Sequence, residues 1–170
     1  MQNDDLTWRD ENYAKILQRL NWLEKEPIGP IYKIKTGLHD ILIMKVGTQI
    51  RLKFLDPVAN EIISRIDISQ PLNLLAPYTR GLMLSLIWVT MPRKVYVLGF
   101  GGGRVPMLLH HYFPTVEIQS TDIEPAIKDI ATRFFGIEFD HRLKLTIQDG
   151  RKYLEQYDTI IRYDIIGMCQ

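Results

Sequence analysis

Three glycines and an aspartate carry the clearest chemistry in this sequence. Gly99, Gly101 and Gly103 directly follow the apolar run 94–98, and Asp122 ends the next apolar run, 116–121. Because glycine has no Cβ, a turn built from it bends sharply and lets a ligand approach the backbone closely. A carboxylate placed after the next strand is suited to accept hydrogen bonds from the vicinal hydroxyls of a ribose. The order of strand, glycine turn, helix, strand and acid therefore predicts a nucleotide-binding βαβ unit.

Strands and helices alternate around these residues. The predicted strands cover 94–98, 116–121, 142–147 and 163–168, and the predicted helices cover 104–112 and 125–135. Short apolar runs that alternate with helical patterns are typical of a parallel sheet with helices on its faces. Open sheets of this kind bind ligands at the carboxyl ends of their strands. We therefore expect the glycine turn, Asp122 and Asp149, which follow three successive strands, to converge on one cleft.

The N-terminal part of the chain carries different patterns. Apolar residues at three- and four-residue spacing predict a helix over 6–25, and alternation predicts a small antiparallel β-hairpin region within 31–68. Pro77 opens a further predicted helix that runs to about residue 88, because proline is tolerated in a first helical turn. The sequence thus divides into an N-terminal helix and β-hairpin region, 1–70, and a Rossmann-like domain, 71–170.

Composition narrows the classes of function. The chain has 170 residues, of which 46% are hydrophobic, and its formal net charge is +1, so bulk charge favours neither nucleic acid nor an anionic membrane as a partner. No apolar run approaches the ~20 residues of a membrane span. Cys169 is the only cysteine and the N-terminus is polar, unlike a signal peptide, so we expect a reducing, cytoplasmic location. No metal site is predicted, because the adjacent His110 and His111 point to different faces of a helix.

Several motifs, taken together, resemble one known family. Their order and spacing are similar to those of the spermidine synthase-like (polyamine aminopropyltransferase) family, which itself resembles class I S-adenosylmethionine-dependent methyltransferases. The segments that carry the resemblance are Pro77–Met83, Leu98–Gly103, Thr121–Pro125, Phe134–Gly136, Gln148–Leu154 and Tyr163–Ile166. The resemblance implies an α/β fold with a Rossmann-like parallel sheet and a small-molecule nucleoside ligand: S-adenosylmethionine, its decarboxylated form or methylthioadenosine.

The resemblance also implies roles for the glycine turn and for the acid after it. The three glycines would face the amino-acid or aminopropyl end of the ligand, and Asp122 would hold the ribose hydroxyls, with Glu124 in the same motif. Asp149 and Gly150 would hold the adenine edge. Two plainer interpretations stay open: Asp122 as the N-cap of the following helix, and Asp149 as a turn residue before glycine.

Two positions depart from the family pattern. Aligned on Tyr163–Ile166, the position of the aspartate that the family uses as a base at the end of its fourth strand is held by Cys169. Aligned on residues 157–161 it is held by Tyr163, and neither register supplies a carboxylate. A strand glutamine near the family's active site falls at Ile63. Tyr78 is the remaining candidate for a substrate contact. A thiol takes a proton from an amine only when its pKa is tuned by its neighbours. The resemblance therefore predicts binding of the nucleoside ligand. It gives less support to aminopropyl transfer to a polyamine.

The sequence leaves several functions open. The first hypothesis is an aminopropyltransferase-like protein that binds the nucleoside; the second is a non-catalytic remnant or association subunit. The third is a methyltransferase that uses the same pocket, and an NAD-linked oxidoreductase is a distant fourth. Residues 94–170 supply four predicted strands, whereas a complete domain of this class has more than four. Of three explanations, we favour a truncated chain over a domain completed by a partner and over a degenerate homologue. We also expect homo-oligomers, because an apolar strand edge is costly to leave in water.

Overall fold

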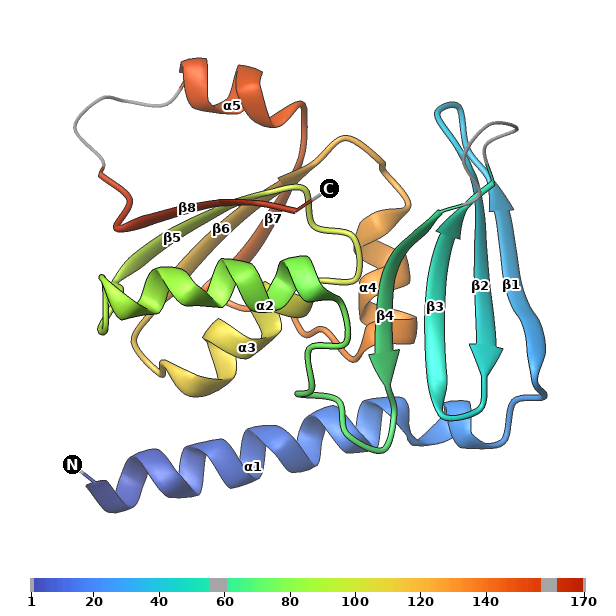
Figure 1. Cartoon of the computed structure of the whole chain (residues 1–170), viewed down its shortest axis with the longest axis horizontal. Helices are drawn as coiled ribbons and strands as arrows, with labels where there is room; N and C mark the ends of the chain where they lie inside the picture. Colours follow the sequence, from blue (N-terminus) through green and yellow to red (C-terminus); the bar gives the residue numbers. More distant parts are fainter. Residues whose placement is uncertain (1, 56–60, 157–161, 170) are drawn as a thin grey trace.

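Two four-stranded sheets form the framework of the protein (Figure 1). The structure, a computed structural model, describes residues 2–55, 61–156 and 162–169. The N-terminal sheet has the strand order β1-β2-β3-β4, and the C-terminal sheet has the order β7-β6-β5-β8. A long helix, α1 (Gln2–Leu20), runs below the helices that cover the C-terminal sheet, and it continues as a 3-10 turn, η1 (Asn21–Glu24), near the lower end of the N-terminal sheet. No helix among the described residues is both long and apolar enough to cross a membrane.

The N-terminal sheet is the antiparallel β-hairpin region that the alternation predicts. Its strands are β1 (Gly29–Lys35), β2 (Asp40–Val46), β3 (Gln49–Phe54) and β4 (Ile62–Asp67). Val46 pairs with Gln49, which leaves a two-residue turn between β2 and β3, and Gly47 adopts φ +61° there. Tight hairpins favour glycine at such a position because a positive φ strains residues that carry a Cβ.

The C-terminal sheet is parallel throughout, as the alternation of strands and helices predicts. Its elements are β5 (Lys94–Leu98), α3 (Arg104–Tyr112), β6 (Glu117–Asp122), α4 (Ile127–Phe135), β7 (Leu143–Ile147), α5 (Gly150–Gln156) and β8 (Ile165–Met168). β5 lies between β6 and β8, and Val95, Tyr96 and Val97 in its middle are buried. A strand covered on both faces reads as a continuous apolar run, which is why 94–98 is easily recognised.

Four helices differ from the sequence-based expectation. α1 begins at Gln2 rather than at residue 6, and its last predicted turn is the 3-10 helix η1. α2 (Pro77–Met83) ends early and continues as a 3-10 helix, η2 (Leu84–Ile87). Ser85 Oγ donates to the carbonyl of Leu82 at 2.8 Å, a local bond that competes with regular helix geometry. α4 begins at Ile127 rather than at residue 125. The sequence analysis did not predict α5.

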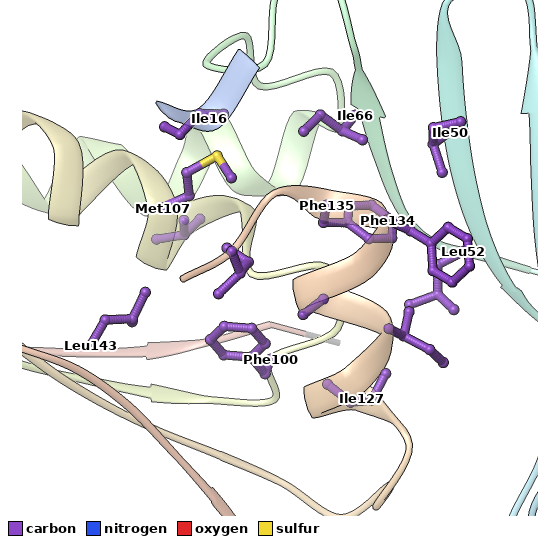
Figure 2. Close-up of a cluster of buried hydrophobic side chains, with 14 of the residues drawn as sticks. Ile16, Ile50, Leu52, Ile66, Phe100, Met107, Ile127, Phe134, Phe135 and Leu143 are labelled. Carbon is purple, nitrogen blue, oxygen red and sulfur yellow. The ribbon is translucent and has the colours of Figure 1, made fainter. Parts of the chain in front are cut away.

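One hydrophobic core joins the two sheets (Figure 2). Phe134 and Phe135 on α4 lie beside the buried side chains of β3 and β4, and Ile16 of α1 lies near Met107 of α3. The labelled side chains from β3 and β4 are Ile50, Leu52 and Ile66. A Cβ built on Gly102 would lie 2.5 Å from the ring of Phe135 and 2.5 Å from Ser64 Oγ. The glycine turn therefore packs directly on α4 and β4, which fixes the N-terminal sheet beside it.

Candidate functional site

The glycine turn after β5 adopts a backbone that requires glycine. Gly99, Gly101 and Gly103 have φ values of +78°, +53° and +63°. A Cβ on Gly99 would lie 2.0 Å from the carbonyl oxygen of Cys169, so no side chain fits there. A Cβ on Gly101 would meet only Ile63 and Ser64, at 3.6 Å and 3.9 Å, so this glycine has room on its open side. The turn thus combines three crowded glycines, Gly99, Gly102 and Gly103, with Gly101, which leaves space beside it.

Asp122 at the end of β6 clamps this turn. Its Oδ2 accepts hydrogen bonds from the backbone N–H groups of Phe100 and Gly101 at 2.8 Å and 3.0 Å, and its Oδ1 accepts one from Glu124 N at 3.0 Å. A carboxylate offers about four lone-pair positions, so three are engaged and one on Oδ1 is left for a ligand hydroxyl. The helix-capping alternative for Asp122 is wrong, because the N-cap of α4 is Ala126 and no side chain caps it.

A cavity of about 160 Å³ opens at this clamp. Its lining residues are Phe54, Ile63, Tyr78, Gly99, Phe100, Gly101, Asp122 and Cys169. Phe54 and Ile63 come from the N-terminal sheet, so both sheets contribute to one cavity. Ligand pockets usually have volumes of roughly 300 Å³ or more. A ligand of nucleoside size would therefore extend beyond this cavity.

The two other polar groups of the cavity are neutral near pH 7. Burial, followed by the charge of Asp122, raises the pKa of the Cys169 thiol to about 11. Burial, followed by the nearby Cys169, raises the pKa of Tyr78 above its ordinary value, and its hydroxyl donates to the carbonyl of Ile63 at 3.3 Å. A protonated thiol with a raised pKa is a poor general base and a poor nucleophile. Asp122 is therefore the charged group among the described residues that line the cavity.

Asp149, Gly150 and Gly103 lie outside the cavity lining. Asp149 follows β7 and its Oδ1 accepts a hydrogen bond from Lys152 N at 2.9 Å, which caps the first turn of α5. A Cβ on Gly150 would lie 2.6 Å from Leu98 Cγ, so this glycine allows α5 to approach the sheet. Gly103 packs against the ring of Phe100. Of the residues expected to converge on one cleft, Gly99, Gly101 and Asp122 line the same cavity, whereas Asp149 does not. The adenine-holding role of Asp149 and Gly150 stays a prediction.

The sequence analysis missed Phe54 as part of the site. Phe54 is the last residue of β3, and its alternation with Leu52 is the signal that places it on the strand. No sequence pattern indicates that this end of the strand faces the glycine turn. The two adjacent histidines do face different neighbours: His110 Nε2 contacts Asp140 Oδ2 at 3.0 Å, and His111 Nδ1 contacts Asn12 at 3.2 Å. Over the described ranges no three His, Cys, Asp or Glu side chains gather as a metal site.

Sequence comparisons relate the chain to two groups of transferases. No protein-family model matches it. It is 34% identical over 77 residues to the eEF1A lysine and N-terminal methyltransferase of Mus musculus, a match that covers 44% of this chain and 11% of that protein. It is 29% identical over 80 residues to the polyamine aminopropyltransferase of Vibrio vulnificus, covering 47% of this chain and 27% of that protein. The matched regions are thus a minor part of these relatives' length.

Solved structures agree on the fold. A probable spermidine synthase from Corynebacterium glutamicum matches with a TM-score of 0.68 and 17% identity, over 84% of this chain and 52% of that one. A spermidine synthase in complex with the transition-state analogue AdoDATO matches with a TM-score of 0.62 and 16% identity, over 84% and 48% of the two chains. The chain therefore has a spermidine synthase-like, class I methyltransferase-like fold, and its sequence is related to both aminopropyltransferases and methyltransferases.

Proposed function

We propose that this protein binds an adenosine nucleoside bearing a sulfur side chain at the cavity between the two sheets. S-adenosylmethionine, its decarboxylated form and methylthioadenosine are the ligands of this class. The observation that carries the proposal is the clamp: a carboxylate with one acceptor position left lies against a glycine turn, and both line one cavity. A ribose hydroxyl is a donor of the right kind for that position.

The residues present fit such a ligand. Gly101 lines the cavity and has no Cβ, so a ligand can approach its backbone closely. Phe54 and Ile63 add apolar surface to the cavity lining, and apolar walls with a few polar groups are the usual make-up of a small-molecule pocket. Asp122 supplies the polar group that orients the ribose.

Among the group transfers open to this fold, the cavity favours methyl transfer over aminopropyl transfer. S-adenosylmethionine supplies an electrophilic carbon on its sulfonium. A polyamine is protonated near pH 7, so its attack on such a carbon needs a base that removes a proton. Asp122 is engaged by three backbone N–H groups and Cys169 is protonated, so neither suits that task. An acceptor that is already nucleophilic needs no base, so methyl transfer to such an acceptor is the transfer that this cavity favours.

Calorimetry with three ligands tests the proposal. We expect S-adenosylhomocysteine and methylthioadenosine to bind and NAD to bind more weakly, because the described residues that line the cavity include a carboxylate and no cationic side chain to meet the pyrophosphate of NAD. Tighter binding of NAD would contradict the proposal. An assay with decarboxylated S-adenosylmethionine and putrescine is expected to show little or no aminopropyl transfer, and turnover at an ordinary enzymatic rate would show that the base has been misplaced.

Two further expectations stay predictions. The first is self-association, for which the exposed apolar side chains near η2 give a reason: Trp88 is 79% exposed and Met91 is 80% exposed. β8 is also an edge strand of the sheet as far as the described residues show, and exposed edges favour pairing with another chain. The second is the cytoplasmic location.

A further inference from the structure

Glu124 is a buried carboxylate that joins the two sheets. It lies in the loop between β6 and α4, and its side chain is fully buried. Oε1 accepts a hydrogen bond from Ala126 N at 3.1 Å. Oε2 accepts hydrogen bonds from Thr36 Oγ1 at 2.8 Å and from His39 Nδ1 at 2.9 Å. A buried carboxylate without partners is costly, so these donors hold the loop and the N-terminal sheet together.

The turn that supplies these donors is well ordered by its own contacts. Thr36 and His39 lie in the turn between β1 and β2, and Thr36 Oγ1 accepts from the backbone N–H groups of Leu38 and His39 at 3.1 Å and 2.9 Å. The single hydroxyl proton has two acceptors within reach, Glu124 Oε2 at 2.8 Å and the His39 carbonyl oxygen at 3.0 Å. We assign it to Glu124, which is the nearer acceptor and the one that carries charge. The His39 ring stacks on Phe54 at a centroid distance of 4.1 Å. The turn therefore contacts both the Glu124 loop and a wall of the cavity.

Glu124 passes this attachment on to the candidate site. Its backbone N–H donates to Asp122 Oδ1, and Asp122 Oδ2 holds the N–H groups of Phe100 and Gly101. An unbroken series of hydrogen bonds thus runs from the turn of the N-terminal sheet through Glu124 and Asp122 to the glycine turn. Removing a donor from Glu124 leaves a buried charge under-satisfied. The loop that begins directly after Asp122 then loses its attachment to the N-terminal sheet, and the Asp122 side chain loses the fixed position of the Glu124 N–H that it accepts from.

We propose that Thr36 and His39 are positioning residues for the nucleoside site, acting through Glu124 to hold Asp122 against the glycine turn. The N-terminal sheet then has a task beyond packing, because it sets the geometry of the acid that meets the ligand. The ligand-binding consequence rests on the proposed function, whereas the effect on the glycine turn does not.

Amide hydrogen exchange tests the positioning role without any ligand. In Thr36→Val we expect exchange at Phe100 and Gly101 to become about tenfold faster, as loss of a charge-assisted hydrogen bond would produce. Thr36→Ser keeps the hydroxyl and should return both rates to near wild type. Thr48→Val is the matched control, because Thr48 Oγ1 donates to an exposed carboxylate, Asp67 Oδ2, at 3.1 Å in another turn of the same sheet.

Val97 in the centre of β5 reports global opening and separates the alternatives. Unchanged rates at Phe100 and Gly101 in Thr36→Val would overturn the proposal. Equal acceleration at Val97 would also overturn it, because the effect would then be a general loss of stability. If Thr36→Val fails to fold, His39→Ala is measured instead, with the same expected and contradicting results.

Methylthioadenosine affinity supplies the second readout. We expect the dissociation constant to rise about tenfold in Thr36→Val and to recover in Thr36→Ser, following the amide rates. If wild type binds no nucleoside while the amide rates change as expected, the proposed function fails and the positioning role stands. If wild type binds and Thr36→Val binds equally well, the positioning role fails and the proposed function stands.

Discussion

The clamp formed by Asp122 gives the sharpest prediction about stability. Asp122→Ala removes the acceptor of three backbone N–H groups, at 2.8, 3.0 and 3.0 Å. The carboxylate is half-buried and faces an open cavity, so water can replace part of each bond, and a loss of about 1 kcal/mol for each bond is reasonable. The free energy of unfolding should therefore fall by about 3 kcal/mol, more than the 1–2 kcal/mol that helix capping would give.

Urea unfolding followed by circular dichroism measures this loss. With a slope of about 2 kcal/mol per molar urea, the midpoint should fall by about 1.5 M. Asp164→Ala is the matched control, because Asp164 Oδ2 also accepts two backbone N–H bonds, from Arg93 at 2.7 Å and Lys94 at 2.9 Å, but on the exposed surface. A midpoint shift in Asp122→Ala no larger than that in Asp164→Ala would refute the reasoning, since it would show that the three bonds do not hold the turn.

Three further results are expected. Iodoacetamide should modify Cys169 slowly at pH 7, because a pKa of about 11 against the ordinary 9.0 lowers the thiolate fraction about a hundredfold; rapid modification would contradict this. Backbone hydrogen bonds from Lys94 and Arg93 lower the pKa of Asp164, so its charge stabilises the fold above about pH 4 and this contribution is lost as pH falls through the lowered value. Asp164→Asn should therefore lose less stability than wild type on acidification, in denaturant melts at successive pH values. Gly99→Ala should lower the free energy of unfolding by more than about 3 kcal/mol, because the added Cβ would meet the Cys169 carbonyl. Gly101→Ala should lower it by about 1 kcal/mol, the cost of a positive φ alone. Equal losses in urea melts would argue against the crowding at Gly99.

The fold was largely predictable because its signals are local. The apolar run 94–98 followed by glycines marks β5 and its turn, and the alternation in 49–54 marks β3. α5 was missed because much of what holds it comes from distant residues. Tyr153 on this helix stacks on Tyr96 of β5 at 5.5 Å, and Gly150 fits against Leu98.

The site was predictable only in part. The residue types and the strand ends identify the glycine turn and Asp122 as neighbours. The way Asp122 uses its carboxylate is set by backbone N–H groups about twenty positions earlier in the chain, and no side-chain pattern reports them. Thr36 and Glu124 are 88 positions apart, so their contact depends on how the two sheets pack. Sequence patterns predict elements and their order, whereas such a contact requires the packed structure.

The central claim is that an adenosine nucleoside meets the protein at the clamp between Asp122 and the glycine turn. The most direct test is an amide-resolved NMR titration with S-adenosylhomocysteine, with Asp122→Ala as the control. We expect saturable shifts that are largest at Phe100 and Gly101 and that are strongly reduced in the variant. Shifts that fall elsewhere, or that persist unchanged in Asp122→Ala, would contradict the account.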